Sequence, residues 1–192
     1  MCEQAEVELS EVGVIAVDIG PGLFTGLRVG IATAKAMAQA LRVPVVGLSS
    51  LDLLAFPVRS TRRLIAAVID GRRGEVFTAY YRQVPGGVQR LSEPAVRRAD
   101  EVAADLVARR EDCLLVGDGA IRYAAAFEGL AGVEPATAGT AYPSAAALVE
   151  LAHPRAVREE FVQPWELQPL YLRHADVDMG MDRRLVPHRP VT

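Results

Sequence analysis

The stretch VIAVDIGPGLFTGLRVGIATAKAMAQALRVPVVGL, residues 14–48, decides the fold class of this chain. It begins with an apolar run of the kind found in strands that are buried on both faces of a parallel sheet. We expect a helix over residues 27–42, which ends before Pro44, and a second buried strand over residues 43–48. Two strands joined by a helix, without a hairpin, predict a parallel β-α-β crossover and therefore an α/β fold.

The chain after residue 63 repeats this plan with additional strands in front. Apolar runs flank the turn sequence DGRRG, and the turn VPGG leads into a third run, which predicts an antiparallel three-stranded meander. A helix, a buried strand and a helix follow, in the order β-β-β-α-β-α. These elements are expected over residues 64–70, 75–82, 88–96, 99–110, 113–118 and 120–130, with a last helix over 144–153.

The two parts of the chain therefore look like one unit repeated, with the front of the first copy missing. We expect residues 1–56 to form a partial first unit and residues 64–173 to form the second. A polar, proline-containing linker joins them. The Pro- and charge-rich residues 174–192 are expected to form a disordered tail.

Four glycines within residues 20–30 raise the question of a phosphate-binding loop. Gly20, Gly22 and Gly26 give G-x-G-x-x-x-G, which is one residue longer than the dinucleotide fingerprint. A Walker loop is also absent, because no lysine follows Gly26. The sequence instead favours a sharp turn into a helix that is capped by Thr25. Phosphate binding at the helix N-terminus stays open as the weaker alternative.

The predicted helix has more apolar or small residues around its circumference than one sheet-covering helix needs. The face expected to pack on the sheet contains Leu27, Ile31, Ala34, Ala38 and Leu41. A second face, small and mostly apolar, contains Gly26, Val29, Gly30, Thr33, Met37 and Ala40. Small residues at this spacing let another helix approach closely. Either a helix of the same chain covers this face, or a partner helix does.

Composition and charge limit the classes of function. The 192-residue chain has a formal net charge of −3, which argues against strong nucleic-acid binding by this chain alone. It contains no apolar run of membrane-spanning length and no signal peptide. The two cysteines fit no metal or redox spacing. We therefore expect a cytoplasmic protein that does not associate with membranes.

The sequence contains no recognisable catalytic constellation. Its three histidines lie within the last forty residues and form no zinc-binding motif, so we expect no metal site. No serine lies in a nucleophile-elbow pattern. Asp18, Asp70 and Asp118 end predicted strands, where they serve either as turn and cap residues or as ligand groups. We therefore assign no catalytic residue.

Five blocks of this sequence together resemble the bacterial TsaB (YeaZ) family. They are GPGLFTGLRVGIATAKAMAQAL, VPVVGLSSLDLLA, IDGRRGEVFTAYY, VGDGA and PLYLR, between residues 14 and 173. The resemblance implies the actin-like ATPase (ASKHA) fold, with two RNase H-like halves of which the first is truncated at its N-terminus. It also implies a part in forming threonylcarbamoyladenosine at adenosine 37 of tRNAs that read ANN codons.

The family's partners follow from the same resemblance. It implies a non-catalytic scaffold or activator that binds the catalytic subunit TsaD, with the ATPase TsaE joining the complex, and a homodimer when TsaD is absent. It implies no cofactor for this chain itself, whereas ATP and a metal ion bind to the partner subunits. It also implies that this chain contacts tRNA only as part of the complex. The matching interface helix would be residues 26–41. Degenerate phosphate loops would lie at Gly20 and Gly22 and at Asp70 and Gly71 of the hairpin 70–74.

The sequence departs from the family pattern at its N-terminus. Family members begin with a strand, a DTS-like turn, two further strands and a long helix, of which MCEQAEVEL would be the end. We therefore expect a late start codon or a truncated form. Two alternative functions stay open: a small-molecule kinase or another ATP-binding enzyme of the actin-like fold, and a glycoprotease-like peptidase.

Overall fold

The computed structural model describes residues 6–172. A short 3-10 helix, η1 (Leu9–Glu11), precedes the first strand. The tail predicted over residues 174–192 lies outside the described residues.

The predicted β-α-β crossover is confirmed. Strand β1 (Ile15–Gly20) leads into helix α2 (Phe24–Leu41) and strand β2 (Val45–Ser49), and β1 and β2 pair in parallel. Helix α3 (Ser50–Ala55) and the 3-10 helix η2 (Phe56–Val58) then lead away from this sheet. Because successive side chains of a strand point to opposite faces, the two strands can bury apolar residues on both sides.

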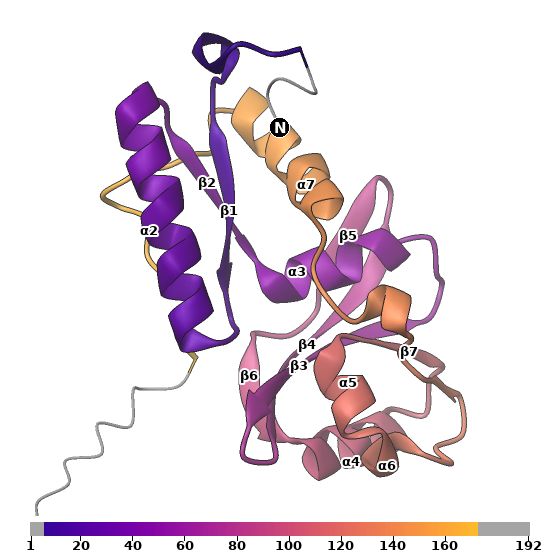
Figure 1. Cartoon of the computed structure of the whole chain (residues 1–192). Coiled ribbons are helices and arrows are strands. Elements are labelled where there is room, and N and C mark those ends of the chain that lie inside the picture. Colours follow the sequence, from indigo (N-terminus) through magenta and orange to yellow (C-terminus); the bar gives the residue numbers. More distant parts are fainter. Residues whose placement is uncertain (1–5, 173–192) are drawn as a thin grey trace, which may run out of the picture.

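Helices cover both faces of this two-stranded sheet (Figure 1). On one face, alternate β1 residues such as Ile15 and Val17 pack with Ile31 and Ala38 of α2. On the other face, residues of β2 and α3 pack against helix α7 (Ala145–Val157). Helix α7 belongs by sequence to the predicted second unit, yet it packs on the sheet of the first, and the domain boundaries stay a prediction.

The second sheet contains the predicted meander. Its strand order is β5-β4-β3-β7-β8, and β6 also pairs with β4. Neighbouring strands β3, β4 and β5 are antiparallel, whereas β7 is parallel to β3 and β8 is parallel to β7. The strands are β3 (Leu64–Arg72), β4 (Glu75–Val84), β5 (Gly87–Arg90), β6 (Ala95–Arg98), β7 (Cys113–Val116) and β8 (Val133–Glu134). The third predicted run, residues 88–96, corresponds to two strands of the structure, β5 and the beginning of β6.

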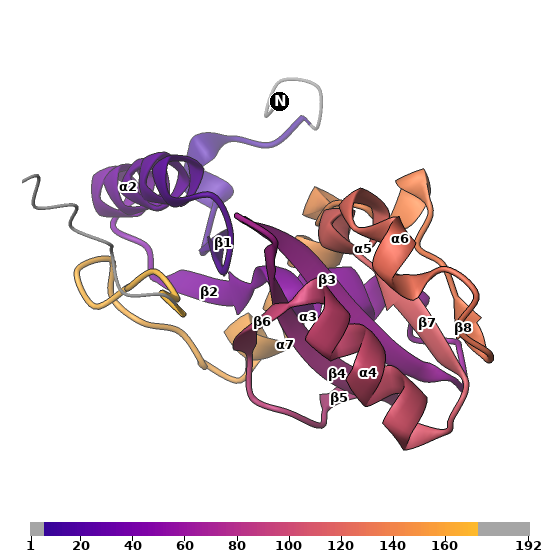
Figure 2. The same ribbon diagram turned by 90° about the horizontal axis from the view of Figure 1, so that it is seen from below.

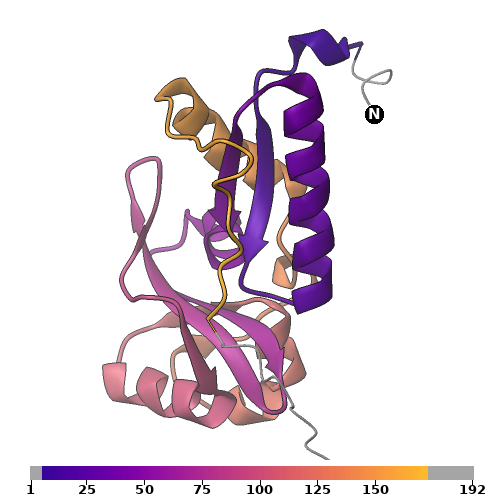
Figure 3. The same cartoon turned by 90° about the vertical axis from the view of Figure 1, so that its left-hand side faces the viewer.

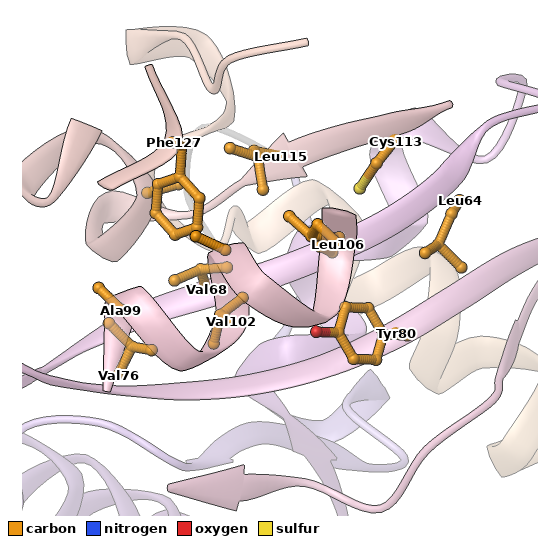
Figure 4. Packing of buried hydrophobic residues seen from close by; sticks show 13 residues of the cluster. Leu64, Val68, Val76, Tyr80, Ala99, Val102, Leu106, Cys113, Leu115 and Phe127 are labelled. Atoms are coloured by element: carbon orange, nitrogen blue, oxygen red, sulfur yellow. The ribbon is translucent and has the colours of Figure 1, made fainter. Parts of the chain in front are cut away.

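Three helices cover one face of this second sheet (Figure 2). They are α4 (Ala99–Arg109), α5 (Asp118–Arg122) and α6 (Ala124–Phe127), and the 3-10 helix η3 (Ala138–Thr140) follows. The sequence predicted one helix over residues 120–130 where the structure has α5 and α6, divided at Tyr123. The main core lies between these helices and the sheet, where Leu106, Leu115 and Phe127 are buried (Figure 4). Helix α3 packs on the opposite face.

Residues 158–172, here called the return segment, bring the chain back to the first sheet (Figure 3). Val162 exchanges two backbone hydrogen bonds of 2.9 Å with Val45 at the edge of β2. Leu167 is buried in the cluster beneath α2, and the amide of Leu170 donates to the carbonyl of Ile19 over 2.8 Å. The return segment, although it lies near the C-terminus in sequence, therefore stabilises the first sheet through contacts with β1, β2 and α2.

Candidate functional site

The outer face of α2 is exposed along its length. All six residues predicted to contact a partner are exposed, and the side chains of Val29 and Met37 are 62% and 47% accessible. A methyl group placed on Gly26 or Gly30 would meet no atom within 4 Å, so no helix of the described chain covers this face. The opposite face of α2 buries Ile31, Ala34 and Ala38, as the periodicity predicts.

The prediction that Thr25 caps α2 is wrong. The helix begins at Phe24, and the first helical hydrogen bond runs from the amide of Leu27 to the carbonyl of Leu23, over 3.0 Å. Leu23 therefore occupies the N-cap position, where an apolar side chain accepts no hydrogen bond from the free amides. Thr25 lies inside the first turn and is exposed.

An aromatic and cationic cluster fixes the N-terminal end of α2 to the return segment. The guanidinium of Arg28 lies 3.7 Å from the centre of the Phe24 ring, and its Nε donates to the hydroxyl of Tyr171 over 3.1 Å. The rings of Phe24 and Tyr171 are 5.6 Å apart. Arg28 and Lys35 are the charged residues of α2, so this helix carries no acidic group.

A cleft of about 720 Å³ lies between this end of α2, the β3–β4 hairpin and the return segment. It is lined by Pro21, Gly22, Leu23, Phe24, Leu27, Arg28, Asp70, Gly71, Arg72, Arg73, Phe77, Leu170, Tyr171 and Leu172. The two loops that the resemblance associates with phosphate thus meet at one cleft, through Gly22 on one side and Asp70 and Gly71 on the other. Gly20 lies behind this lining, with a φ of 101° and Leu27 against it.

Asp70 is fully engaged by groups of its own chain. Its Oδ1 accepts hydrogen bonds from the amide of Arg72, at 2.9 Å, and from the hydroxyl of Tyr123, at 3.0 Å. Its Oδ2 lies 3.2 Å from Nη1 of Arg72 and 3.4 Å from Nε of Arg122. Asp70 therefore fixes the conformation of the hairpin.

The other two strand-end carboxylates also bond to the chain itself. Oδ1 of Asp18 accepts from the amide of Gly20, at 2.8 Å, and from the hydroxyl of Ser50, at 2.6 Å. Burial raises the pKa of Asp18, and these two hydrogen bonds partly oppose that rise. Oδ1 of Asp118 accepts from the amide of Asp70 over 3.1 Å. Of the two readings left open for these aspartates, the geometry favours turn and cap residues.

The glycines of the sequence GDGA allow helix α5 to pack closely against strand β3. A Cβ on Gly117 would lie 2.2 Å from the carbonyl oxygen of Val68, and one on Gly119 would lie 2.7 Å from the carbonyl carbon of Ile69. These two glycines let α5 lie directly against β3, which places Asp118 beside Asp70. Within residues 6–172, no three His, Cys, Asp or Glu side chains gather closely enough to hold a metal ion.

Known proteins match this chain over most of its length. The family model described as TsaD, tRNA N6-adenosine threonylcarbamoyltransferase, matches residues 1–176. The tRNA threonylcarbamoyladenosine biosynthesis protein TsaB of Bacillus subtilis is 38% identical over 90 residues, which are 47% of this chain and 38% of that protein. A solved structure from Pseudomonas aeruginosa, described as similar to the peptidase YeaZ, superposes with a TM-score of 0.76 at 31% identity. The chain belongs to the TsaB (YeaZ) family.

The extent of these matches differs between relatives. The P. aeruginosa match covers 90% of this chain and 79% of that one. An uncharacterized Mycobacterium leprae protein, ML0378, is 41% identical over 172 residues, covering 90% of this chain and 41% of its own length. The chain thus spans about two fifths of the M. leprae and B. subtilis relatives. The YeaZ likeness confirms the expected α/β fold of the actin-like type.

Sequence reasoning did not find the cluster of Phe24, Arg28 and Tyr171. The one available signal was the aromatic residue in PLYLR, which the pattern alone does not connect to α2. No helix within the described residues combines the length and apolar character that membrane crossing requires.

Proposed function

We propose that this TsaB-family chain takes part in threonylcarbamoyladenosine formation on tRNA as a non-catalytic subunit that binds a TsaD-type transferase. The B. subtilis relative named for this pathway and the matching TsaD model support the pathway. In this proposal the chain is cytoplasmic, TsaE joins the assembly, and a homodimer forms through the same face when TsaD is absent. ATP and a metal ion act in the partner subunits.

The observation that carries the proposal is the exposed outer face of α2. Gly26 and Gly30 leave open space where a partner helix can approach, and Val29 and Met37 supply apolar surface beside them. Small residues allow short distances between helix axes, and apolar side chains provide the favourable burial. An exposed face of this composition is expected to bind another protein.

The carboxylates support the non-catalytic part of the proposal. A general base or a metal ligand needs lone pairs directed at a substrate or an ion. Asp18 and Asp70 instead direct theirs at the amides and hydroxyls of their own chain and at Arg72 and Arg122. Both side chains are therefore explained by turn and hairpin geometry.

One observation favours a second candidate, an ATP-binding enzyme of the actin-like fold. The cleft of about 720 Å³ lies between the two loops that resemble phosphate loops, and its size suits a small molecule. Calorimetry of the isolated chain with ATP and Mg²⁺ tests it. Micromolar or tighter affinity would support this candidate over the scaffold proposal. The third alternative, a peptidase, would require peptide cleavage that a chelator abolishes.

The direct test is size-exclusion chromatography with light scattering, on the chain alone and mixed with TsaD from the same organism. We expect a stable complex with the unaltered chain. We expect Gly30→Leu to abolish it, because a leucine side chain fills the space that the partner helix would occupy. The helix itself tolerates the change, since leucine favours helical structure more than glycine does.

Ala108→Leu provides the matched control. It adds a leucine to an exposed position of α4, away from α2, and should leave the complex intact. Equal co-elution of all three proteins would contradict the assignment of the α2 face. Absence of a complex with the unaltered chain would contradict the proposed function.

A further inference from the structure

We propose that the cleft beside α2 receives an acidic, apolar segment of the protein partner that binds α2. This inference rests on the proposed function, and it adds a second contact area with a defined chemistry. The occupant is an extended stretch of the partner that carries carboxylates next to apolar side chains.

The charge of the cleft indicates the acidic part. Its lining within residues 6–172 contains three arginines, Arg28, Arg72 and Arg73, and one carboxylate, Asp70. Asp70 is 7% accessible and bonded to Arg72 and Arg122, so it balances part of this positive charge, and the lining keeps a net excess of arginine. Helix α2 contributes no acidic residue either. A carboxylate is the side-chain group that complements such a surface.

The other lining residues indicate the apolar part. Leu27, Phe77, Leu170 and Leu172 lie in the lining, and Phe24 and Tyr171 contribute aromatic rings. Apolar surface of this kind is favourably covered by side chains that bury themselves against it. A highly charged, purely hydrophilic stretch would leave these walls uncovered, so the occupant carries apolar side chains as well as carboxylates.

The arginines are held in place before any ligand arrives. Arg28 stacks on Phe24 and donates to Tyr171, two neutral partners, so that within residues 6–172 no carboxylate balances its positive charge. Arg72 is tied to Asp70 through both its amide and its side chain, while its own side chain remains 54% accessible. Preorganised charges lose less conformational freedom when they bind.

The cleft is continuous with the outer face of α2. Leu23 and Phe24 lie in its lining, are 57% and 44% accessible, and stand within one turn of Gly26. A partner that covers the small-residue face can therefore reach the cleft without leaving contact with the helix. This continuity favours a segment of that same partner as the occupant.

The test measures the affinity of the TsaD-type subunit for variants of the full chain. Arg28→Gln and Arg72→Asn are combined in one protein. Asparagine suits position 72, because Arg72 has a φ of 65° and asparagine tolerates this left-handed conformation. Arg110→Asn is the matched control, since Arg110 has a φ of 55°, is exposed and ends α4, away from the cleft.

We expect the double variant to lose about tenfold or more in affinity and to show a weaker salt dependence of binding. Arg110→Asn should bind as the unaltered chain does. In the complex, amide hydrogen exchange should slow over residues 21–28 and 70–77. That protection should be lost in the double variant, even at protein concentrations that saturate the α2 face.

Two results overturn the inference while leaving the proposed function standing. One is unchanged affinity of the double variant in an assay where Gly30→Leu abolishes binding. The other is a complex in which residues 70–77 exchange as fast as in the free chain. If the unaltered chain binds no TsaD-type subunit at all, both the proposed function and this inference are wrong.

Discussion

Asp70 illustrates how a single buried carboxylate organises one edge of the cleft. It accepts hydrogen bonds from Arg72 and Tyr123 and pairs with the side chains of Arg72 and Arg122. These contacts join the hairpin after β3 to the end of α5. A buried charge with four such contacts, made by three residues, contributes to stability, whereas a pair of exposed side chains contributes little.

Replacing Asp70 with asparagine keeps the volume and one acceptor oxygen but removes the charge. We expect the free energy of unfolding to fall by about 1–3 kcal/mol, because charge-assisted hydrogen bonds to a buried group are lost. Urea denaturation measures the difference. The matched control is Asp100→Asn, whose partner Arg98 and own side chain are both mostly exposed, so a much smaller change in the free energy of unfolding is expected there. Equal effects at the two positions would contradict the role assigned to Asp70.

At the scale of elements, sequence patterns predicted the strands, turns and helices whose formation depends on residues close together in the sequence. The strands around residues 14–19 and 64–70, the meander and helix α4 follow from apolar periodicity and turn residues. The outer face of α2 was also predicted from helical spacing, and its six residues are exposed. Local sequence is sufficient to predict such features because the apolar periodicity lies within one element and the turn residues lie within the loop that joins two elements.

The features that the sequence did not predict depend on contacts between distant residues. The hydrogen bond between Arg28 and Tyr171 joins residues 143 positions apart, and it defines one wall of the cleft. The division of the predicted helix at Tyr123 coincides with a contact between Tyr123 and Asp70, 53 positions away. The short edge strand β6 depends on β4 for its pairing. No periodicity in the sequence encodes any of these pairings.

The contact between α5 and β3 is the element-scale feature that depends most on glycine. A methyl group on Gly119 would lie 2.7–2.9 Å from backbone atoms of residues 68–70, which cannot rotate away. We expect Gly119→Ala to lower the free energy of unfolding by about 1–3 kcal/mol through overpacking. Gly139→Ala, where the new methyl meets only the Thr137 hydroxyl at 3.8 Å, should change it by less than about 0.5 kcal/mol. Thermal unfolding of both variants decides whether GDGA is a packing motif.

At the scale of the whole molecule, the return segment connects the first sheet with the cleft. It follows α7, pairs with the edge of β2 at Val162, buries Leu167 beneath α2 and ends at Tyr171 and Leu172 in the cleft lining. The part of the molecule proposed to bind a partner is thus held by a segment that lies more than a hundred residues further along the chain.

Leu167→Ala tests this dependence. Leu167 is 3% accessible and packs with Ile31, Ala38 and Val45, so its truncation leaves a cavity and should lower the free energy of unfolding by about 2–4 kcal/mol. Because the lost contacts lie within the first sheet, amide exchange should accelerate in β1, α2 and β2 more than in β3 and β4. Leu91→Ala, at a position 45% accessible, makes the same chemical change with a small expected effect. Uniform acceleration across both sheets would instead mean that the two sheets unfold as one cooperative unit. In that case α2 would depend on the whole fold, and the return segment would have no separate part in holding the partner-binding face.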